Sequence, residues 1–304
     1  MKEHKKYMDI IRYGKKETQE VLNVGDYITI SEKLDGSNAS FSHDPNSEIN
    51  VSCFSRNLKL NFSNNLNGFY QWVENKISPQ VDKLNPNWRY YGEWLKKHKV
   101  DYQPEYYNDF HLFNIYDETT HQYLSDDLVE SESQKLGLST VEYFYKGEFI
   151  DFEHLMSFVG KSNKTLVPDT GEGIVVKNVN YRDKFGQQMF VKLVSEAFAE
   201  IQPRRLPKNP KADEYVMELV KSVVTKNRVE KIISKCVDDQ ELDEDYSIES
   251  MGKIIKIVSG KVYADCMKEE SEVFEGIESQ EIGKLFSKII PSVIKEVLKE
   301  QGRA

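Results

Sequence analysis

The chain has 304 residues, of which 39% are hydrophobic and 30% are charged, and its formal net charge is -9. This length and composition predict a globular protein of one large or two smaller domains, with a sizeable core. The negative net charge excludes a protein that coats nucleic acid by bulk positive charge, but it leaves room for a local basic groove. The cysteines form no CxxC pair, which argues against a disulfide framework or a zinc knuckle.

The N-terminal residues 1–16 carry charges where a signal peptide needs an apolar run. No stretch of the chain approaches the roughly 18 uninterrupted apolar residues of a membrane-spanning helix. We therefore expect a soluble, cytoplasmic protein with no membrane partner. The sequence also indicates no obligate protein partner.

The first two-thirds of the chain predict many strands. Runs rich in β-branched and aromatic residues recur at 27–30, 49–53, 88–94, 110–116, 173–179 and 189–194. A short helix is expected at 70–77, but the strands are not separated by regular helices, so a doubly wound parallel sheet is a poor fit. We expect an antiparallel-rich α+β domain over residues 1–202.

The character of the sequence changes after residue 202. Three prolines interleaved with Arg204, Arg205 and two lysines predict a stiff basic linker over 203–211. Beyond it, apolar residues follow the three-and-four spacing of amphipathic helices, which predicts a smaller all-helical domain over 212–304. Pro291 is expected to kink the last helix or restart it. The acidic run 238–245 predicts a solvated loop between helices.

A lysine in a tight turn is the sharpest local feature. Lys33-Leu34-Asp35-Gly36 follows a predicted strand, and a lysine becomes a nucleophile when burial or neighbouring cations lower its pKa. Gly36 lets the backbone turn tightly and approach another group closely. Alone, the pattern fits an exposed lysine before a turn equally well.

Four further segments add side chains of matching chemistry. Glu93 lies in an aromatic-flanked strand and is suited to binding ribose hydroxyls, although an outward-facing strand glutamate would look the same. Phe113 is suited to stacking on a purine base, with a core strand as the alternative. Lys177 and Lys192 each lie in a strand. Gathered in one pocket, they would neutralise a phosphate and lower the pKa of Lys33.

The order and spacing of these segments resemble those of the covalent nucleotidyltransferases, the superfamily of ATP-dependent ligases and mRNA capping enzymes. The resemblance covers residues from about 30 to 200. The segments that resemble its motifs I, III, IIIa, IV and V are 33–36, 91–93, 110–115, 172–177 and the strand of Lys192.

Within the superfamily the chain resembles most the RNA ligase branch of phage double-strand RNA ligases and kinetoplastid RNA-editing ligases. The first motif continues with Ser37-Asn38, as in that branch, and Arg56 lies where that branch has a functional arginine. The C-terminal region is also expected to be helical, whereas DNA ligases and capping enzymes carry a β-rich OB domain there.

The resemblance implies that Lys33 attacks the α-phosphate of ATP and holds AMP as a phosphoramidate. The AMP would pass to an RNA 5′-phosphate, and a 3′-hydroxyl would then displace it, as in RNA repair or nick sealing. The implied ATP-binding residues are Glu32, Lys33, Asn38, Arg56, Glu93, Phe113, Lys177 and Lys192. Glu172 would place a magnesium ion, directly or through water, with manganese as an alternative. RNA ends or nicked duplex RNA would contact Asn38, Arg56, Arg204 and Arg205.

Two departures from the branch's pattern keep other interpretations open. Asn114 stands where the phage-like pattern has an aspartate, and Val194 stands where a second lysine is common. One alternative is therefore a non-catalytic member that binds RNA ends or nucleotide. The other is a capping-type guanylyltransferase or a DNA ligase, for which a β-rich C-terminal domain is expected.

Overall fold

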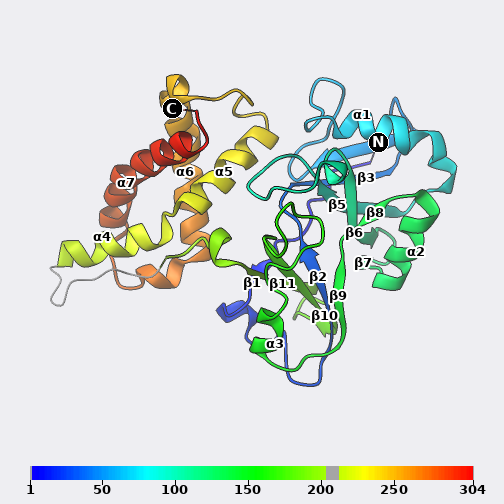
Figure 1. Cartoon of the computed structure of the whole chain (residues 1–304), viewed down its shortest axis with the longest axis horizontal. Helices are drawn as coiled ribbons and strands as arrows, with labels where there is room; N and C mark the ends of the chain where they lie inside the picture. The colour runs from blue at the N-terminus through cyan, green and yellow to red at the C-terminus, as the bar shows by residue number, and fades with distance from the viewer. Residues whose placement is uncertain (1, 203–211, 304) are drawn as a thin grey trace. The chain divides into compact units, whose positions relative to one another are not determined.

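A computed structural model describes residues 2–202 and 212–303 (Figure 1). The chain divides into two units, Met1–Ser195 (unit 1) and Glu196–Ala304 (unit 2). The first domain was expected to extend to residue 202, whereas unit 1 ends at Ser195. The expected linker at 203–211, with Arg204 and Arg205, lies outside the described residues.

Unit 1 contains two β-sheets. Six of their strands follow the predicted apolar and aromatic runs, whereas the strands at Ser37–His43 and Tyr143–Glu148 were not predicted. In the first sheet the only parallel pair among the described strands is β1 with β11. Its strands, in spatial order, are β1 (Ile11–Arg12), β11 (Gln188–Val194), β10 (Gly173–Arg182), β2 (Tyr27–Lys33) and β9 (Tyr143–Glu148).

The second sheet of unit 1 has six strands and is antiparallel along its main path. The five strands of the main path are, in spatial order, β4 (Val51–Ser55), β3 (Ser37–His43), β5 (Trp88–Trp94), β6 (Phe110–Asp117) and β7 (Gln122–Tyr123). The short β8 (Ser139–Thr140) pairs in parallel with β6. The mixed, antiparallel-rich fold expected from the sequence is confirmed.

Helices of unit 1 connect and cover these strands. Aromatic side chains of α1 pack with those of β3, β5 and β6 in one core, in which Phe41, Phe69 and Phe110 are fully buried. The helical segments are η1 (Lys16–Thr18), α1 (Phe69–Lys76), η2 (Ser78–Lys83), η3 (Pro104–Tyr106), α2 (Asp126–Leu136) and α3 (Phe152–Met156).

The first sheet has one apolar face and one polar face, because side chains alternate along a strand. Ile28 and Ile30 of β2 and Ile174 of β10 are buried in a common core. The residues that alternate with Ile28 and Ile30 along β2 therefore point to the opposite face. Lys33, at the end of β2, is one of them. From Lys33 the chain passes through only three residues into β3 of the second sheet.

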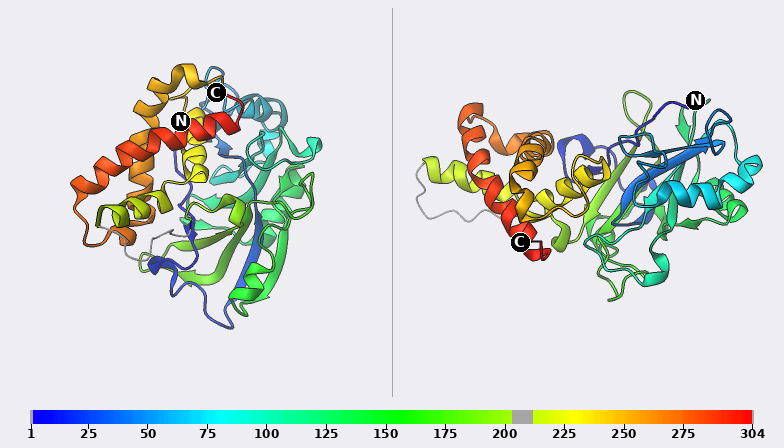
Figure 2. Two further views of the ribbon diagram at one scale, coloured as in Figure 1. Left: turned by 60° about the vertical axis from the view of Figure 1, so that its left-hand side comes forward. Right: turned by 90° about the horizontal axis from the view of Figure 1, so that it is seen from above.

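The described residues of unit 2 form helices and no strand (Figure 2). Their apolar stripes meet in one core, as the three-and-four spacing predicted. The segments are η4 (Glu196–Phe198), α4 (Ala212–Val223), α5 (Lys226–Asp238), η5 (Ile248–Ser250), α6 (Met251–Glu269), η6 (Ser271–Phe274) and α7 (Ser279–Glu300). None of the described helices combines the length and apolarity needed to cross a bilayer.

The expectation that Pro291 restarts the last helix is wrong, because α7 continues through this residue. A proline inside a helix removes one backbone hydrogen bond. Ile290 and Ile294 on either side of it are buried in the core of unit 2, and this burial holds both halves of the helix in place. The acidic run is confirmed as a loop, since α5 ends at Asp238 and the next helical segment begins at Ile248.

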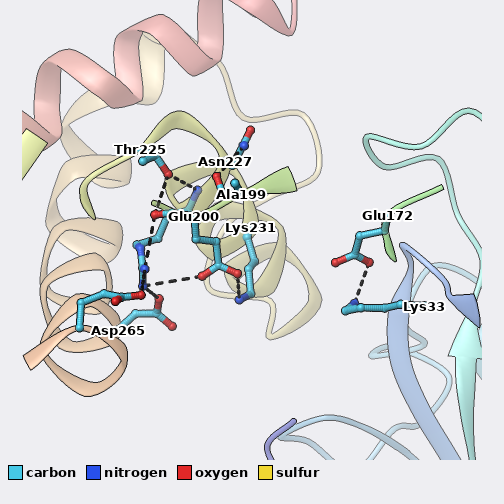
Figure 3. A network of polar contacts seen from close by, with 10 residues as sticks. Lys33, Glu172, Ala199, Glu200, Thr225, Asn227, Lys231 and Asp265 are labelled. Atoms are coloured by element: carbon cyan, nitrogen blue, oxygen red, sulfur yellow. Dashed lines mark hydrogen bonds and ion pairs between the residues drawn. The ribbon is translucent and has the colours of Figure 1, made fainter. Parts of the chain in front are cut away.

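A charged cluster anchors the start of unit 2 to α5 and α6. The Arg228 side chain has no exposed surface, and its guanidinium forms ion pairs with Asp265, Glu270 and Glu200. Glu200 also pairs with Lys231 at 2.6 Å, and its backbone carbonyl accepts a hydrogen bond from the Thr225 hydroxyl. This cluster (Figure 3) explains why residues just after β11 belong to unit 2.

Candidate active site

Lys33 lies where the chain leaves the first sheet of unit 1 and enters the second. Gly36 makes this passage short, because a Cβ added there would lie 2.7 Å from the Trp94 backbone oxygen. A side chain at position 36 would therefore push the turn away from β5. Glycine is needed at this position because the backbone of the turn passes close to β5.

Asp35 fixes the same turn from the other side. Its carboxylate accepts hydrogen bonds from the backbone N–H groups of Lys99 and Val100, both at 2.9 Å, and its own N–H donates to the Tyr102 hydroxyl. His98 lies 3.6 Å from the same carboxylate. Although burial opposes it, these partners hold the pKa of Asp35 below its usual value. The sequence did not predict this clamp, because its partners lie more than sixty residues away.

Three predicted lysines share one face of the first sheet. Gly173 of β10 is the register partner of both Lys33 and Val194, while Lys192 pairs with Val175. Because alternate residues share a face, Lys33, Lys192 and Lys177 all project from the polar face. The position that a second motif V lysine would occupy, Val194, lies directly across Gly173 from Lys33.

Two predicted carboxylates lie beside Lys33. The Lys33 Nζ forms an ion pair with Glu172 at 2.7 Å (Figure 3), and both side chains are mostly buried. Glu93 Oε1 accepts a hydrogen bond from the backbone N–H of Gly36 at 3.1 Å. Asn38 of β3 is the register partner of Glu93, so their side chains share one face of the second sheet.

These carboxylates set the protonation of the site. Burial alone would lower the pKa of Lys33, but the charges of Glu172 and Glu93 outweigh it and raise that pKa. Burial raises the pKa of Glu93 to about 7, with Lys33 opposing the rise and Glu172 adding to it. Burial also raises the pKa of Glu172, against the effect of Lys33.

The expectation that Lys177 and Lys192 lower the pKa of Lys33 is wrong for this arrangement, because the carboxylates dominate. Lys177 is buried and forms an ion pair with Asp126 at the start of α2, which neutralises its charge. Lys192 is half-buried and lowers the pKa of Glu172. The sequence did not predict Asp126 as a partner, because it lies 51 residues from Lys177.

Glu32 is separated from these groups. It precedes Lys33 in β2, so its side chain points to the opposite face of the first sheet. There it is buried, accepts a hydrogen bond from the Ser162 hydroxyl and pairs with Lys164 at 2.7 Å. The structure therefore does not bring the Glu32 carboxylate together with Glu93 and Glu172.

The N-terminal segment lies against Phe113 and Asn114. The Tyr7 ring is buried, its centre is 5.0 Å from that of Phe113, and its hydroxyl donates to Asn114 Oδ1. Phe113 itself is half-buried and is the unpaired residue at an irregularity in the pairing of β5 with β6, a feature that re-aims side chains. The sequence did not predict Tyr7, because it lies far from every motif.

Arg56 contacts the same segment, where its guanidinium forms an ion pair with Asp9. The structure thus brings Lys33, Glu93, Glu172 and Lys192 close together. It places Phe113 and Arg56 against the N-terminal segment instead.

The described residues hold no cluster of three or more His, Cys, Asp or Glu side chains able to bind a metal ion alone. Glu172 is mostly buried beside Lys33 and offers one carboxylate to a metal ion. A single carboxylate fits magnesium, which takes one or two protein carboxylates and completes its shell with water and substrate phosphate.

Comparisons with known proteins show the family of the chain. A family model described as RNA ligase matches residues 26–194, which is more than half of the chain. The chain therefore belongs to the RNA ligase family. The resemblance to the nucleotidyltransferase superfamily is confirmed, while the double-strand RNA ligase branch stays a prediction.

Solved structures of an RNA ligase from Naegleria gruberi are similar to part of the chain. The structure with PPi is 22% identical, with a TM-score of 0.48, and the match covers 64% of this chain and 57% of that one. A mutant with ATP and Mn is 21% identical, with a TM-score of 0.47, and the match covers 63% and 56%. The chain thus matches little more than half the length of these ligases. No curated protein matches it.

Proposed function

We propose that this protein is an ATP-dependent RNA ligase that joins a 5′-phosphate to a 3′-hydroxyl through a lysyl-AMP on Lys33 and an RNA-adenylate. The observation that carries the proposal is the position of Lys33, bonded to Glu172 and flanked by Glu93, within the RNA ligase match. Sealing of nicks or breaks in structured RNA is the role that fits this reaction.

The first step needs a neutral amine at Lys33. The Nζ lone pair attacks the α-phosphorus of ATP, a P–N bond forms, and the bond to the pyrophosphate oxygen breaks. Glu172 accepts the hydrogen bond from the Lys33 ammonium and is in position to take its proton. Because the carboxylates raise the pKa of Lys33, the step depends on compensating their charge.

A divalent cation, magnesium or manganese, would supply that compensation and balance the phosphate charge. Glu172 is the residue that would help to hold it, directly or through water, together with the substrate phosphates. Lys192 projects from the same face as Lys33 and would contact a phosphate. Lys177 is paired with Asp126, so its part is to hold α2 against the sheet unless the pair opens.

The nucleoside would lie over the second sheet. Glu93 and Asn38 share a face there, which suits hydroxyl groups of a ribose, and Phe113 offers an aromatic ring for a purine. Arg56 and Asn38 would contact the RNA end, with Arg56 exchanging Asp9 for phosphate. The helical domain after the basic linker would help to orient the RNA.

The test is self-labelling with ATP or GTP that carries a labelled α-phosphate, in the presence of magnesium. Label from ATP that is acid-labile and alkali-stable, and that Lys33→Ala abolishes, is expected. Lys135→Ala is the matched control, because Lys135 is an exposed lysine of α2 paired with Glu132. Label from GTP alone would indicate a capping enzyme, and bound nucleotide without label would indicate a non-catalytic binding protein.

A further inference from the structure

Four lysines form a row along α7. Lys284, Lys288, Lys295 and Lys299 are spaced by four, seven and four residues, and all four are exposed. With 3.6 residues per turn these positions fall on one side of the helix, and the row extends about 22 Å along its axis. We call these four residues the α7 lysine row.

The α7 lysine row is not needed to hold the helix in place. The buried face of α7 lies on the other side, where Ile282, Phe286, Ile290 and Ile294 pack into the core of unit 2. Like charges four residues apart destabilise a helix by about 0.2–0.5 kcal/mol. The row therefore costs stability without contributing to packing.

Within the described part of unit 2, five other exposed or half-buried lysines are ion-paired, whereas none of the four in the row is, and neither is the exposed Lys256 of α6. Unit 2 has more acidic than basic residues, so the row is not a consequence of composition. The paired lysines and their partners are Lys221 with Glu218, Lys226 with Glu300, Lys231 with Glu200, Lys253 with Asp243 and Lys261 with Glu241.

The chemistry of the row favours a polyanion with regularly placed charges. A membrane surface is a poor fit, because membrane-bound helices insert an apolar face and that face of α7 is already buried. A protein partner is also a poor fit, since lysine is depleted at protein interfaces and no large apolar side chain stands in the row. Binding to a nucleic-acid backbone requires only cations spaced along a line, which contact successive phosphates.

We propose that the α7 lysine row binds the phosphate backbone of the RNA substrate, independently of base sequence. This proposal rests on the proposed function for the identity of the polyanion. Contacts of this kind position a protein on nucleic acid without reading its bases. Each one releases a counterion, so the affinity must fall steeply with salt.

The experiment compares the unaltered 304-residue chain with a variant in which the row is neutralised, K284Q/K288Q/K295Q/K299Q. Binding to a fluorescent nicked RNA duplex is measured at several potassium chloride concentrations. The slope of log K against log salt is expected to become shallower by about two to four, since each phosphate contact contributes about 0.9. At about 0.1 M salt the affinity is expected to fall by about tenfold or more.

The matched control is K221Q/K226Q/K253Q/K261Q, which changes the net charge of unit 2 by the same amount but removes lysines that are already paired. Its slope is expected to stay close to that of the unaltered protein. Equal slopes for the two variants would overturn the proposal, because bulk charge would then explain the effect.

Self-labelling by ATP is measured on the same preparations and separates this proposal from the function itself. Labelling is expected to be unchanged in the row variant, because its residues take no part in the first step. If the unaltered protein shows no labelling, the proposed function fails, while the RNA-binding slopes still test the row. Two double variants, K284Q/K288Q and K295Q/K299Q, test the proposal if the fourfold variant misfolds. Each is expected to change the salt-dependence slope by about half as much.

Discussion

At the residue scale, the balance of charge around Lys33 decides its chemistry. Its ammonium is held by Glu172 at 2.7 Å and stabilised further by Glu93, so the amine is stored in its protonated form. In the proposed reaction, a divalent cation beside Glu172 would offset the carboxylate charge and lower the pKa of Lys33. Cation binding would thereby be coupled to the reactivity of Lys33.

Glu93 makes the stability of the protein depend on pH. Its folded-state pKa of about 7 lies above the ordinary value of 4.5, so the folded state binds more protons between these two pH values. The contribution of Glu93 to stability therefore falls as pH rises from about 4.5 to about 7. Glu93→Gln is expected to reduce this fall, measured as the difference in urea midpoint between pH 5 and pH 7.

The control for this prediction is Glu105→Gln, a change of the same chemistry at an exposed residue of η3. It should leave the pH dependence of the midpoint unaltered. An equal effect of both variants would show that the pH dependence comes from overall charge rather than from the environment of Glu93.

At the element scale, the turn between β2 and β3 joins the two sheets of unit 1. Gly36→Ala places a Cβ 2.7 Å from the Trp94 oxygen and 3.0 Å from side-chain atoms of Glu93 and Leu95. Since a backbone oxygen cannot move aside easily, we expect a destabilisation of about 1–3 kcal/mol and weakened self-labelling. Thermal unfolding and the labelling assay together would measure it.

Gly260→Ala provides the contrast, because no atom lies within 4 Å of the added Cβ in α6. There the higher helix propensity of alanine is expected to stabilise the protein by up to about 1 kcal/mol. If Gly36→Ala were equally harmless, the close approach of the turn to β5 would not be a constraint.

In unit 2, the ion-pair cluster around Arg228 holds the start of the unit against α5 and α6. Arg228→Met would leave Glu270, which is almost fully buried, and Asp265 without their cation. Removing one partner of a buried ion pair costs about 3–5 kcal/mol. Differential scanning calorimetry is expected to show a lower unfolding transition for unit 2 and little change for unit 1.

Lys253→Met serves as the control, because the ion pair of Lys253 with Asp243 is exposed. Pairs of this kind contribute at most about 1 kcal/mol. A comparable loss of stability in both variants would contradict the prediction that the buried ion pairs of Arg228 contribute more than an exposed pair.

At the scale of the whole molecule, each unit has a core of its own. The residues proposed to bind and transfer AMP, from Lys33 to Lys192, all belong to unit 1. A chain ending at Ser195 is therefore expected to fold and to label itself with ATP, but to lose the joining of RNA ends. Circular dichroism, the labelling assay and ligation of a nicked duplex would test these expectations.

The shortened chain keeps the hydrogen bond from the Ser195 N–H to the Glu172 carbonyl, which is why the cut is placed after this residue. A folded fragment without labelling would contradict the assignment of the first step to unit 1. A fragment that still joins RNA would contradict a role for the helices in sealing.

Much of this molecule is determined by the sequence alone. The strand at 88–94 follows from its aromatic composition, and the amphipathic helices after residue 212 follow from a side-chain period of 3.6. Both are local properties of the chain. The ordered motifs from Lys33 to Lys192 likewise predicted the RNA ligase family, and the family match confirms it. Local patterns survive folding because they depend only on near neighbours.

Only the tertiary structure decided the electrostatics and the partners of the site. Asp126 neutralises Lys177 from 51 residues away, and Tyr7 bonds Asn114 across 107 residues. Glu32 and Lys33 are adjacent in the chain but point to opposite faces of one sheet. The pKa of a buried group depends on distances through space, so the protonation of Lys33 is fixed only when the two sheets and their carboxylates come together.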